Sequence, residues 1–386
     1  MSLTAINAEF WGDLQRDLYV ENTAMLLANR TGESVISQNG KKIHRPIMSQ
    51  PTIGTYTPGT DITSPHKTAT DSELSVSTFK YASETVDRTH EAQTPYDLVS
   101  HSQEAIRRGL LNQVEQEYLS KVSDAGHNLG TSAVALTSSN VIDKFEHAKA
   151  IIRSNDAPMD TGSCFSVMGP QTIALLQSTK ADRATGLGDT TLANGVTGSF
   201  LGWTVVENNN LPYSATLTVD TQPTANDTVT IANVTFKFVS SLSAAGDVLI
   251  GADVAASRAN LKAAIEGGSG AGTTYTAVSE HHRYMLTKRA IAITSAEAMA
   301  ITGFGDIMTK ETFTAGTNVF SAQKQTAIFM CRGAIDLVLQ LFELDTTDVE
   351  KQFGRMVKGM IGVGAKAFED GQRLMVKLEV DASSFR

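Results

Sequence analysis

The residues of this sequence best suited to chemistry are a glycine-rich run, a histidine pair and a few close carboxylates. Residues 362–367 match the loose pattern G-x-G-x-x-A, in which a glycine turn brings the backbone close to a dinucleotide pyrophosphate. That fingerprint needs a following βαβ unit, whereas this run lies near the C-terminal end and leads directly to a strand-like segment. We therefore expect no nucleotide site here.

His281 and His282 follow Glu280 and are candidate metal ligands. Adjacent side chains of a strand point to opposite faces of the sheet, so two neighbouring histidines on a strand do not converge on one ion. A loop or surface pair is therefore favoured over a metal site.

Two pairs of neighbouring carboxylates are candidates for acid–base chemistry, namely Glu84 with Asp87 and Glu115 with Glu117. Both pairs stand among lysines and arginines, which is typical of solvated faces. The sequence also lacks a Walker loop, a G-x-S-x-G elbow, an H-E-x-x-H helix and a C-x-x-C pair. We expect no catalytic, metal-binding or cofactor-binding residues, and we do not expect an enzyme.

Cys164 and Cys331 are the two cysteines, and each stands inside an apolar run. Two buried, reduced thiols are the favoured interpretation. A disulfide or a metal site is the alternative.

The 386 residues carry a net charge of −9, with acidic and basic residues interspersed. Direct, sequence-independent binding of DNA or of an anionic membrane needs clustered Lys and Arg, so the charge disfavours that class of function. A protein that encloses nucleic acid without gripping it remains compatible. No run of about eighteen residues is apolar, so we expect a cytoplasmic chain with neither a membrane span nor a secretory signal.

The chain is organised around a long helix that we expect over residues 94–125. Thr94 is the expected N-cap, Pro95 the first helical residue, and Gly126 the left-handed cap that ends the helix. Apolar residues follow at helical spacing, namely Val99, Ile106, Leu110, Val114 and Tyr118. At 1.5 Å per residue the helix is roughly 48 Å long, which suits a shell subunit better than an enzyme.

The segments before this helix lack a core of their own. Residues 1–33 hold a loosely helical apolar pattern that we expect to lie on another surface, of the same subunit or of a neighbour. An ordinary first helix packed within its own chain is equally compatible. Residues 51–72 are rich in Pro, Thr, Gly and Ser and stand between strand-like segments around 43–47 and 74–86. This pattern predicts a projecting hairpin arm that is stabilised across an adjacent copy.

Local patterns also predict the elements that follow. We expect a helix over residues 141–154, a buried strand over 164–168, a short helix over 170–178, and a strand with a turn over 195–213. From 214 to about 320 the composition shifts toward Thr, Ala, Val and Gly, which predicts an inserted domain. It has a hairpin over 228–239, a helix capped by Asp253 and ended by Gly267, and strands over 275–278, 284–286 and 290–294. Late apolar runs, ending with a strand over 374–380, are expected to pair with the early strands in one sheet.

The order of these features resembles the major capsid proteins of tailed bacteriophages with the HK97-type fold. The stretches that carry the resemblance are EFWGDLQRDL, ANRTGE, NGKKIHRPI, PTIGTYTPGTDIT, LSVSTFKYASETVD, GVTGSFLGWTVVENNNLP and GMIGVGAKAFEDGQRLMVKLEV. They span residues 1–213 and about 322–386. The segment between them is similar to small β-rich modules of phage structural proteins.

The resemblance implies an α+β, HK97-type capsid fold with an inserted mainly-β domain. It assigns residues 1–50 to an N-terminal arm and first strand, 51–90 to an extended loop, 91–138 to a peripheral domain with the spine helix 94–125, 139–213 to the first part of an axial domain, 214–321 to the inserted domain, 322–345 to the axial return, and 346–386 to the closing peripheral strands.

The implied function is that of a structural major capsid protein, which self-assembles into the icosahedral head shell enclosing phage double-stranded DNA. The implied partners are copies of itself as pentamers and hexamers, with scaffolding, portal and decoration proteins as further candidates, no sequence-specific contact with DNA and no membrane. The implied location is the virion, after assembly in the host bacterial cytoplasm. The candidate subunit-contact residues are Phe10, Trp11, Leu14, Tyr56, Thr60, Asp61, His66 and Lys67. Some relatives link subunits covalently through a loop lysine, but no partner for Lys67 is identifiable, so that chemistry is not expected.

Two other functions stay open. The shell of a bacterial encapsulin-like nanocompartment uses the same fold, and the inserted module and the phage-like opening count against it. A phage tail or decoration protein is disfavoured by the long helix and the arm before it. Packaged content, DNA or cargo enzyme, distinguishes the first alternative.

Overall fold

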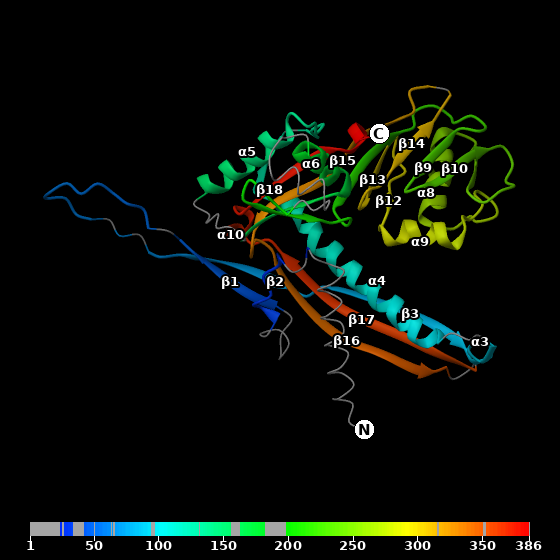
Figure 1. The fold of residues 1–386 in the computed structure, drawn as a ribbon, viewed down its shortest axis with the longest axis horizontal. Coiled ribbons are helices and arrows are strands. Elements are labelled where there is room, and N and C mark those ends of the chain that lie inside the picture. The colour runs from blue at the N-terminus through cyan, green and yellow to red at the C-terminus, as the bar shows by residue number, and fades with distance from the viewer. Residues whose placement is uncertain are drawn as a thin grey trace.

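The computed structural model describes residues 24, 27–33, 42–49, 51–62, 64, 66–93, 97–130, 132–155, 163–181, 198–314, 316–349 and 353–385. These residues form an elongated body (Figure 1). A hairpin projects from it, a long helix lies on a narrow sheet, and a larger sheet with flanking helices continues into a β-rich end.

The projecting hairpin consists of β1 (Lys42–Met48) and β2 (Ala69–Ser75), which pair antiparallel over their full length. It confirms the predicted hairpin. The strand expected over residues 74–86 is divided, because β2 ends at Ser75 and β3 (Thr78–Asp87) begins only after the buried Val76.

The long helix is shorter than predicted and has a different cap. After the short helix α3 (Arg88–Gln93), α4 spans Leu98–Ser120 and ends in a 3-10 turn, Lys121–Asp124. Asp97 is the N-cap, and its carboxylate accepts a hydrogen bond from the backbone N–H of Ser100 at 3.1 Å. The predicted cap, Thr94, lies outside the described residues.

Gly126 is required for a different reason than predicted. Its φ is not positive, so it is not a left-handed cap. Its backbone N–H donates to the carbonyl of Gln372 at 3.0 Å, and an added Cβ would lie 2.9 Å from that oxygen. A distant turn therefore approaches too closely for any side chain at this position.

Helix α4 packs on a three-stranded antiparallel sheet in which β17 (Gly354–Lys366) lies between β16 (Asp336–Asp348) and β3. An early strand therefore pairs with late ones, as predicted, but the last strand, Met375–Asp381, belongs to a different sheet. Gly359 lets the helix approach the sheet, since a Cβ there would lie 3.1 Å from Ile106 and 3.2 Å from Leu110 of α4. The core between the two layers includes Val357, Ile361 and Val363.

The central sheet has nine strands in the described part of the chain. Its middle strand, β15 (Val319–Cys331), pairs with strands on both of its edges. β18 (Met375–Asp381) pairs with β15 and with β4 (His127–Asn128). The opposite edge of β15 pairs with two strands in succession, β8 (Pro212–Thr218) and β5 (Cys164–Met168). The sheet then continues to β7 (Trp203–Glu207) and β6 (Ser199–Phe200) beyond β5, and to β13 (Ala298–Phe304) and β12 (Ala292–Ile293) beyond β8.

The predicted helices and strand of this region are confirmed. α5 spans Val141–Ser154, β5 spans Cys164–Met168, and α6 spans Pro170–Ala181. Phe145 of α5 packs edge-to-face on Phe329 of β15 at 5.0 Å between ring centroids. The short helix α10 (Glu369–Gln372) precedes β18, and a 3-10 turn, Ala382–Phe385, follows it.

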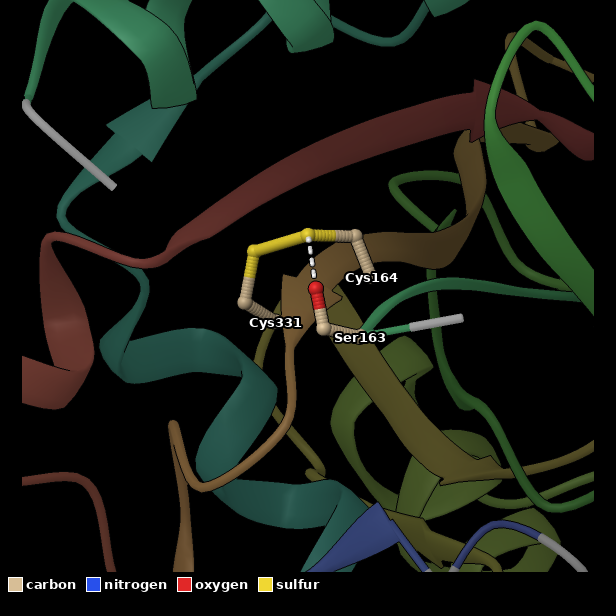
Figure 2. Close-up of a disulfide and its surroundings, with 3 residues drawn as sticks. All are labelled: Ser163, Cys164 and Cys331. Carbon is tan, nitrogen blue, oxygen red and sulfur yellow. Dashed lines mark hydrogen bonds between the residues drawn. A yellow bond between two sulfur atoms is a disulfide. The ribbon is translucent and has the colours of Figure 1, made fainter. Parts of the chain in front are cut away.

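Cys164 and Cys331 form a disulfide between β5 and β15 (Figure 2), so the expectation of two reduced thiols is wrong. The two residues stand directly opposite each other in the antiparallel register of these strands. Opposed positions bring the two Cβ atoms close together, as a disulfide requires.

The β-rich end has a four-stranded sheet in the order β11 (Asp247–Leu249), β10 (Val234–Val239), β9 (Thr228–Ile231) and β14 (Thr309–Thr312). The predicted hairpin is β9–β10, and the predicted helix is α8 (Val254–Glu266), capped by Asp253 and ended by the left-handed Gly267. The strand predicted over 284–286 is wrong, because these residues belong to α9 (Glu280–Lys288), which Ser279 caps. His281 and His282 are therefore exposed helical residues.

Candidate assembly surface

The tip of the hairpin carries apolar side chains that no other described residue covers. Residues 51–62 are exposed throughout, and Ile53, Tyr56 and Ile62 expose 97%, 63% and 76% of their area. A monomeric protein rarely holds apolar side chains this far into water, and such clusters mark interaction sites. The other predicted contact residues of this loop, Thr60, Asp61, His66 and Lys67, are exposed as well.

The base of the hairpin is packed, in contrast to its tip. Leu74 and Val76 form a small core with Val338 of β16 and Phe368, and Ile43 of β1 packs against it. Because its base is packed against the body, the hairpin holds its exposed tip in a defined direction.

Arg45 also stabilises the base of the hairpin, through its positive charge. Its guanidinium donates to the carboxylate of Asp370 at 2.7 Å and to that of Asp336 at 3.5 Å. It also lies over the ring of Phe368, 5.2 Å from the centroid, where a cation is attracted by the π system. Burial raises the pKa of the Asp336 carboxyl, and the hydrogen bond from Asn29 and the charge of Arg45 oppose that rise.

Two exposed side-chain contacts join β1 to β2 across the hairpin. Lys42 contacts Glu73 at 2.8 Å, and His44 contacts Asp71 at 2.6 Å. The hydrogen bond from Lys42 holds the pKa of the Glu73 carboxyl below its usual range. Pairs this exposed are screened by water and ions, so they set the register more than they stabilise the hairpin.

A second apolar surface lies on the sheet face opposite α4. Phe79 and Tyr81 of β3 are both exposed, and Tyr81 stands directly across from Met360 of β17. Since Ala82 packs against the α4 core and side chains alternate along a strand, Phe79 and Tyr81 point away from the helix. Sequence reasoning missed this surface, although the alternation of aromatic residues in β3 was visible.

Glu115 is not on a solvated face, as the sequence suggested, but is 1% exposed. Its two carboxylate oxygens accept from the side-chain amides of Asn208 at 2.8 Å and Asn210 at 2.6 Å. Burial raises the pKa of Glu115, while the hydrogen bonds from Asn210, Asn208 and the backbone of Ala24 act in the opposite direction. This buried network joins the long helix to the asparagine-rich turn after β7. Glu117 does match the expectation, because it pairs with Lys121 at the surface.

The remaining candidate residues are dispersed. Residues 362–366 lie inside β17, where all five pair with β16 and residues 362 and 363 also pair with β3, so the glycine pattern is not a nucleotide loop. Within the described part of the chain, no three His, Cys, Asp or Glu side chains are arranged to hold a metal ion. Phe10, Trp11 and Leu14 lie outside the described residues. No described helix has the length and apolar character needed to cross a membrane.

The sequence matches no family model and no curated protein. Solved structures do match: one titled "Mycobacterium phage Che8" has a TM-score of 0.56 at 14% identity and covers 91% of this chain and 89% of that one. One titled "Capsid structure of the Cyanophage P-SCSP1u" has a TM-score of 0.51 at 12% identity and covers 89% of this chain and 84% of that one. Both likenesses cover about nine-tenths of this chain. The chain therefore has the α+β fold of phage capsid subunits, the HK97-type fold that its sequence resembles.

Proposed function

We propose that this protein is a structural, non-enzymatic subunit that self-assembles into the icosahedral head shell of a tailed phage and encloses double-stranded DNA. The observation that carries the proposal is the hairpin, with its packed base and its exposed apolar tip, on a chain with the fold of a phage capsid subunit. A closed shell repeats each contact between subunits by symmetry, so a modest contact made by one projecting arm recurs throughout the shell.

In this proposal the hairpin lies across an adjacent copy, where the outward face of β3 and β17 offers it the exposed apolar side chains of Phe79, Tyr81 and Met360. The part of the central sheet around β5, β7, β15 and β18, with α5 and α6, acts as the axial domain of pentamers and hexamers, and α4 with the sheet of β3, β16 and β17 acts as the peripheral domain. The net charge of −9 suits a wall that holds DNA without adhering to it. Assembly in the host cytoplasm and contacts with scaffolding, portal or decoration proteins belong to the same proposal.

The test replaces Ile53, Tyr56 and Ile62 with serine in one variant. All three side chains are exposed, so the subunit should keep its circular dichroism spectrum and its unfolding temperature. Each contact between copies loses about 5 kcal/mol of apolar burial, which removes closed shells. Light scattering and negative-stain electron microscopy measure the outcome.

The matched control is Met308→Ser with Val319→Ser, which removes two exposed apolar side chains elsewhere and should leave assembly intact. Shells of normal size from the triple variant would contradict the role of the hairpin. Shells that contain an enzyme cargo in place of DNA would favour the nanocompartment alternative.

A further inference from the structure

A groove separates the long helix from the β-rich end. It has a volume of about 880 Å³ and runs between the Lys80–Ala82 part of β3, the middle of α4 and helix α9. In Figure 1, α9 lies beside α4 along this boundary. Tyr284 of α9, which exposes 60% of its area, and the half-buried Ile291 contribute apolar surface to its lining. The groove is therefore suited to an amphipathic segment.

The charged residues that line the groove are predominantly cationic. Lys80 and Lys288 are exposed at its two sides, and within the described part of the chain neither has an acidic partner. Arg283 also lines it, with its guanidinium donating to the carbonyls of Ala264 and Ile265. The one acidic residue of the lining, Glu266, pairs with Lys262 at 3.2 Å. An occupant of this groove should carry negative charge beside an apolar face.

The first 23 residues of the chain have that combination. Their four carboxylates recur every fourth residue, at Glu9, Asp13, Asp17 and Glu21, against a single arginine. Apolar residues recur with the same spacing one position later, at Phe10, Leu14 and Leu18. Residues four apart lie on one face of a helix, so a helix here has an acidic stripe directly beside an apolar stripe.

The point where this segment joins the body lies at one end of the groove. Ala24 is buried in the core under α4, and its backbone is a hydrogen-bond donor to Glu115. Asn210 donates to the same carboxylate at 2.6 Å and itself lines the groove. A segment tethered this close has an effective concentration in the millimolar range, well above that of free copies in dilute solution.

We infer that residues 1–23 bind this groove within their own chain as an amphipathic helix, with Phe10, Leu14 and Leu18 on the apolar lining and the acidic stripe along Lys80 and Lys288. The contact joins the long helix to the β-rich end, which hydrogen bonds from Asn112 and Gln116 to the Lys288 carbonyl also connect. It assigns Phe10 and Leu14 to a contact within the subunit in place of one between copies.

Hydrogen–deuterium exchange of the unassembled, full-length subunit tests this inference. The first variant is Glu9→Lys with Asp13→Lys and Asp17→Lys. Exchange in α9 and in residues 108–113 should become about tenfold faster, since reversing three charges weakens the contact by roughly that factor. The charge-matched control, Glu146→Lys with Glu297→Lys and Glu369→Lys, changes exposed acids elsewhere and should leave these exchange rates unchanged.

The second variant, Lys80→Glu with Lys288→Glu, should accelerate exchange in the same peptides, and combining both variants should restore protection. Protection should not depend on protein concentration. Equal exchange in the first variant and its control would overturn the inference, as would a combined variant without restored protection. Protection that disappears on dilution would assign the groove to the segment of a second copy. Because the subunit is unassembled, failure here leaves the shell proposal untouched.

Discussion

Reduction of the Cys164–Cys331 disulfide is expected to destabilise the subunit without changing its packing. Cys164 is fully buried and Cys331 nearly so, and both sulfur atoms remain in place after reduction, so no cavity forms. What is lost is the constraint that the cross-link places on the unfolded chain.

The size of the effect follows from the separation of the two cysteines. They are 167 residues apart, and the loop-closure entropy for that length corresponds to about 5 kcal/mol at 25 °C. Native disulfides usually deliver somewhat less, so we expect the free energy of unfolding to fall by about 3–5 kcal/mol.

Urea unfolding of the unassembled subunit, followed by fluorescence with and without reductant, measures this difference. The control is the double variant Cys164→Ser with Cys331→Ser, for which reductant should have no effect. A thiol titration of the oxidised protein in denaturant should find no free thiol. Two titratable thiols, or a wild-type unfolding curve that reductant does not move, would refute the reasoning.

Two further substitutions probe the long helix. Asp97→Ala removes the side chain that caps α4, so the free energy of unfolding should fall by about 1 kcal/mol, and an undiminished urea midpoint would show that Asp97 is not the effective cap. Glu115→Gln tests the buried carboxylate, whose pKa is raised by burial above its ordinary value of 4.5. The protonated carboxyl stabilises the folded state fully at pH values below the ordinary pKa, and this contribution is lost as the pH rises through the raised pKa of the folded state. Glutamine does not titrate, so the unfolding free energy of the variant should decline less steeply with pH over this range. Identical pH profiles for wild type and variant would contradict the burial of an ionisable group at this position.

Local sequence signals were sufficient for elements whose ends are set by near neighbours. The helix over residues 141–154, the β9–β10 hairpin and the helix between Asp253 and Gly267 all agree with the prediction. Each depends on caps, turns and hydrophobic spacing within a few residues, which are read directly from the sequence. The strand predicted over Tyr284–Leu286 was wrong, because three consecutive apolar residues fit a strand and a helix equally well and the N-cap at Ser279 was overlooked.

The candidate site was predictable in part, for the same reason. The exposed loop between β1 and β2 follows from a long stretch that is mostly polar and has few large apolar residues, and the sequence therefore indicated Tyr56, Thr60, Asp61, His66 and Lys67. The packed base of the hairpin was not predictable, because Val338 and Phe368 join it from nearly three hundred residues away. Nor was the groove beside α9, which exists only where two distant segments meet.

By itself, the sequence determined the long helix, the projecting hairpin and the α+β character of the chain, since periodicity and turn residues act over short distances. Tertiary structure alone decided that Cys164 faces Cys331, that Glu115 is buried between two asparagines, and that Gly126 makes room for a carbonyl. These three outcomes depend on which strands become neighbours. Strand pairing joins residues hundreds of positions apart, and its register is set by the summed burial of both partners, so no local pattern records it.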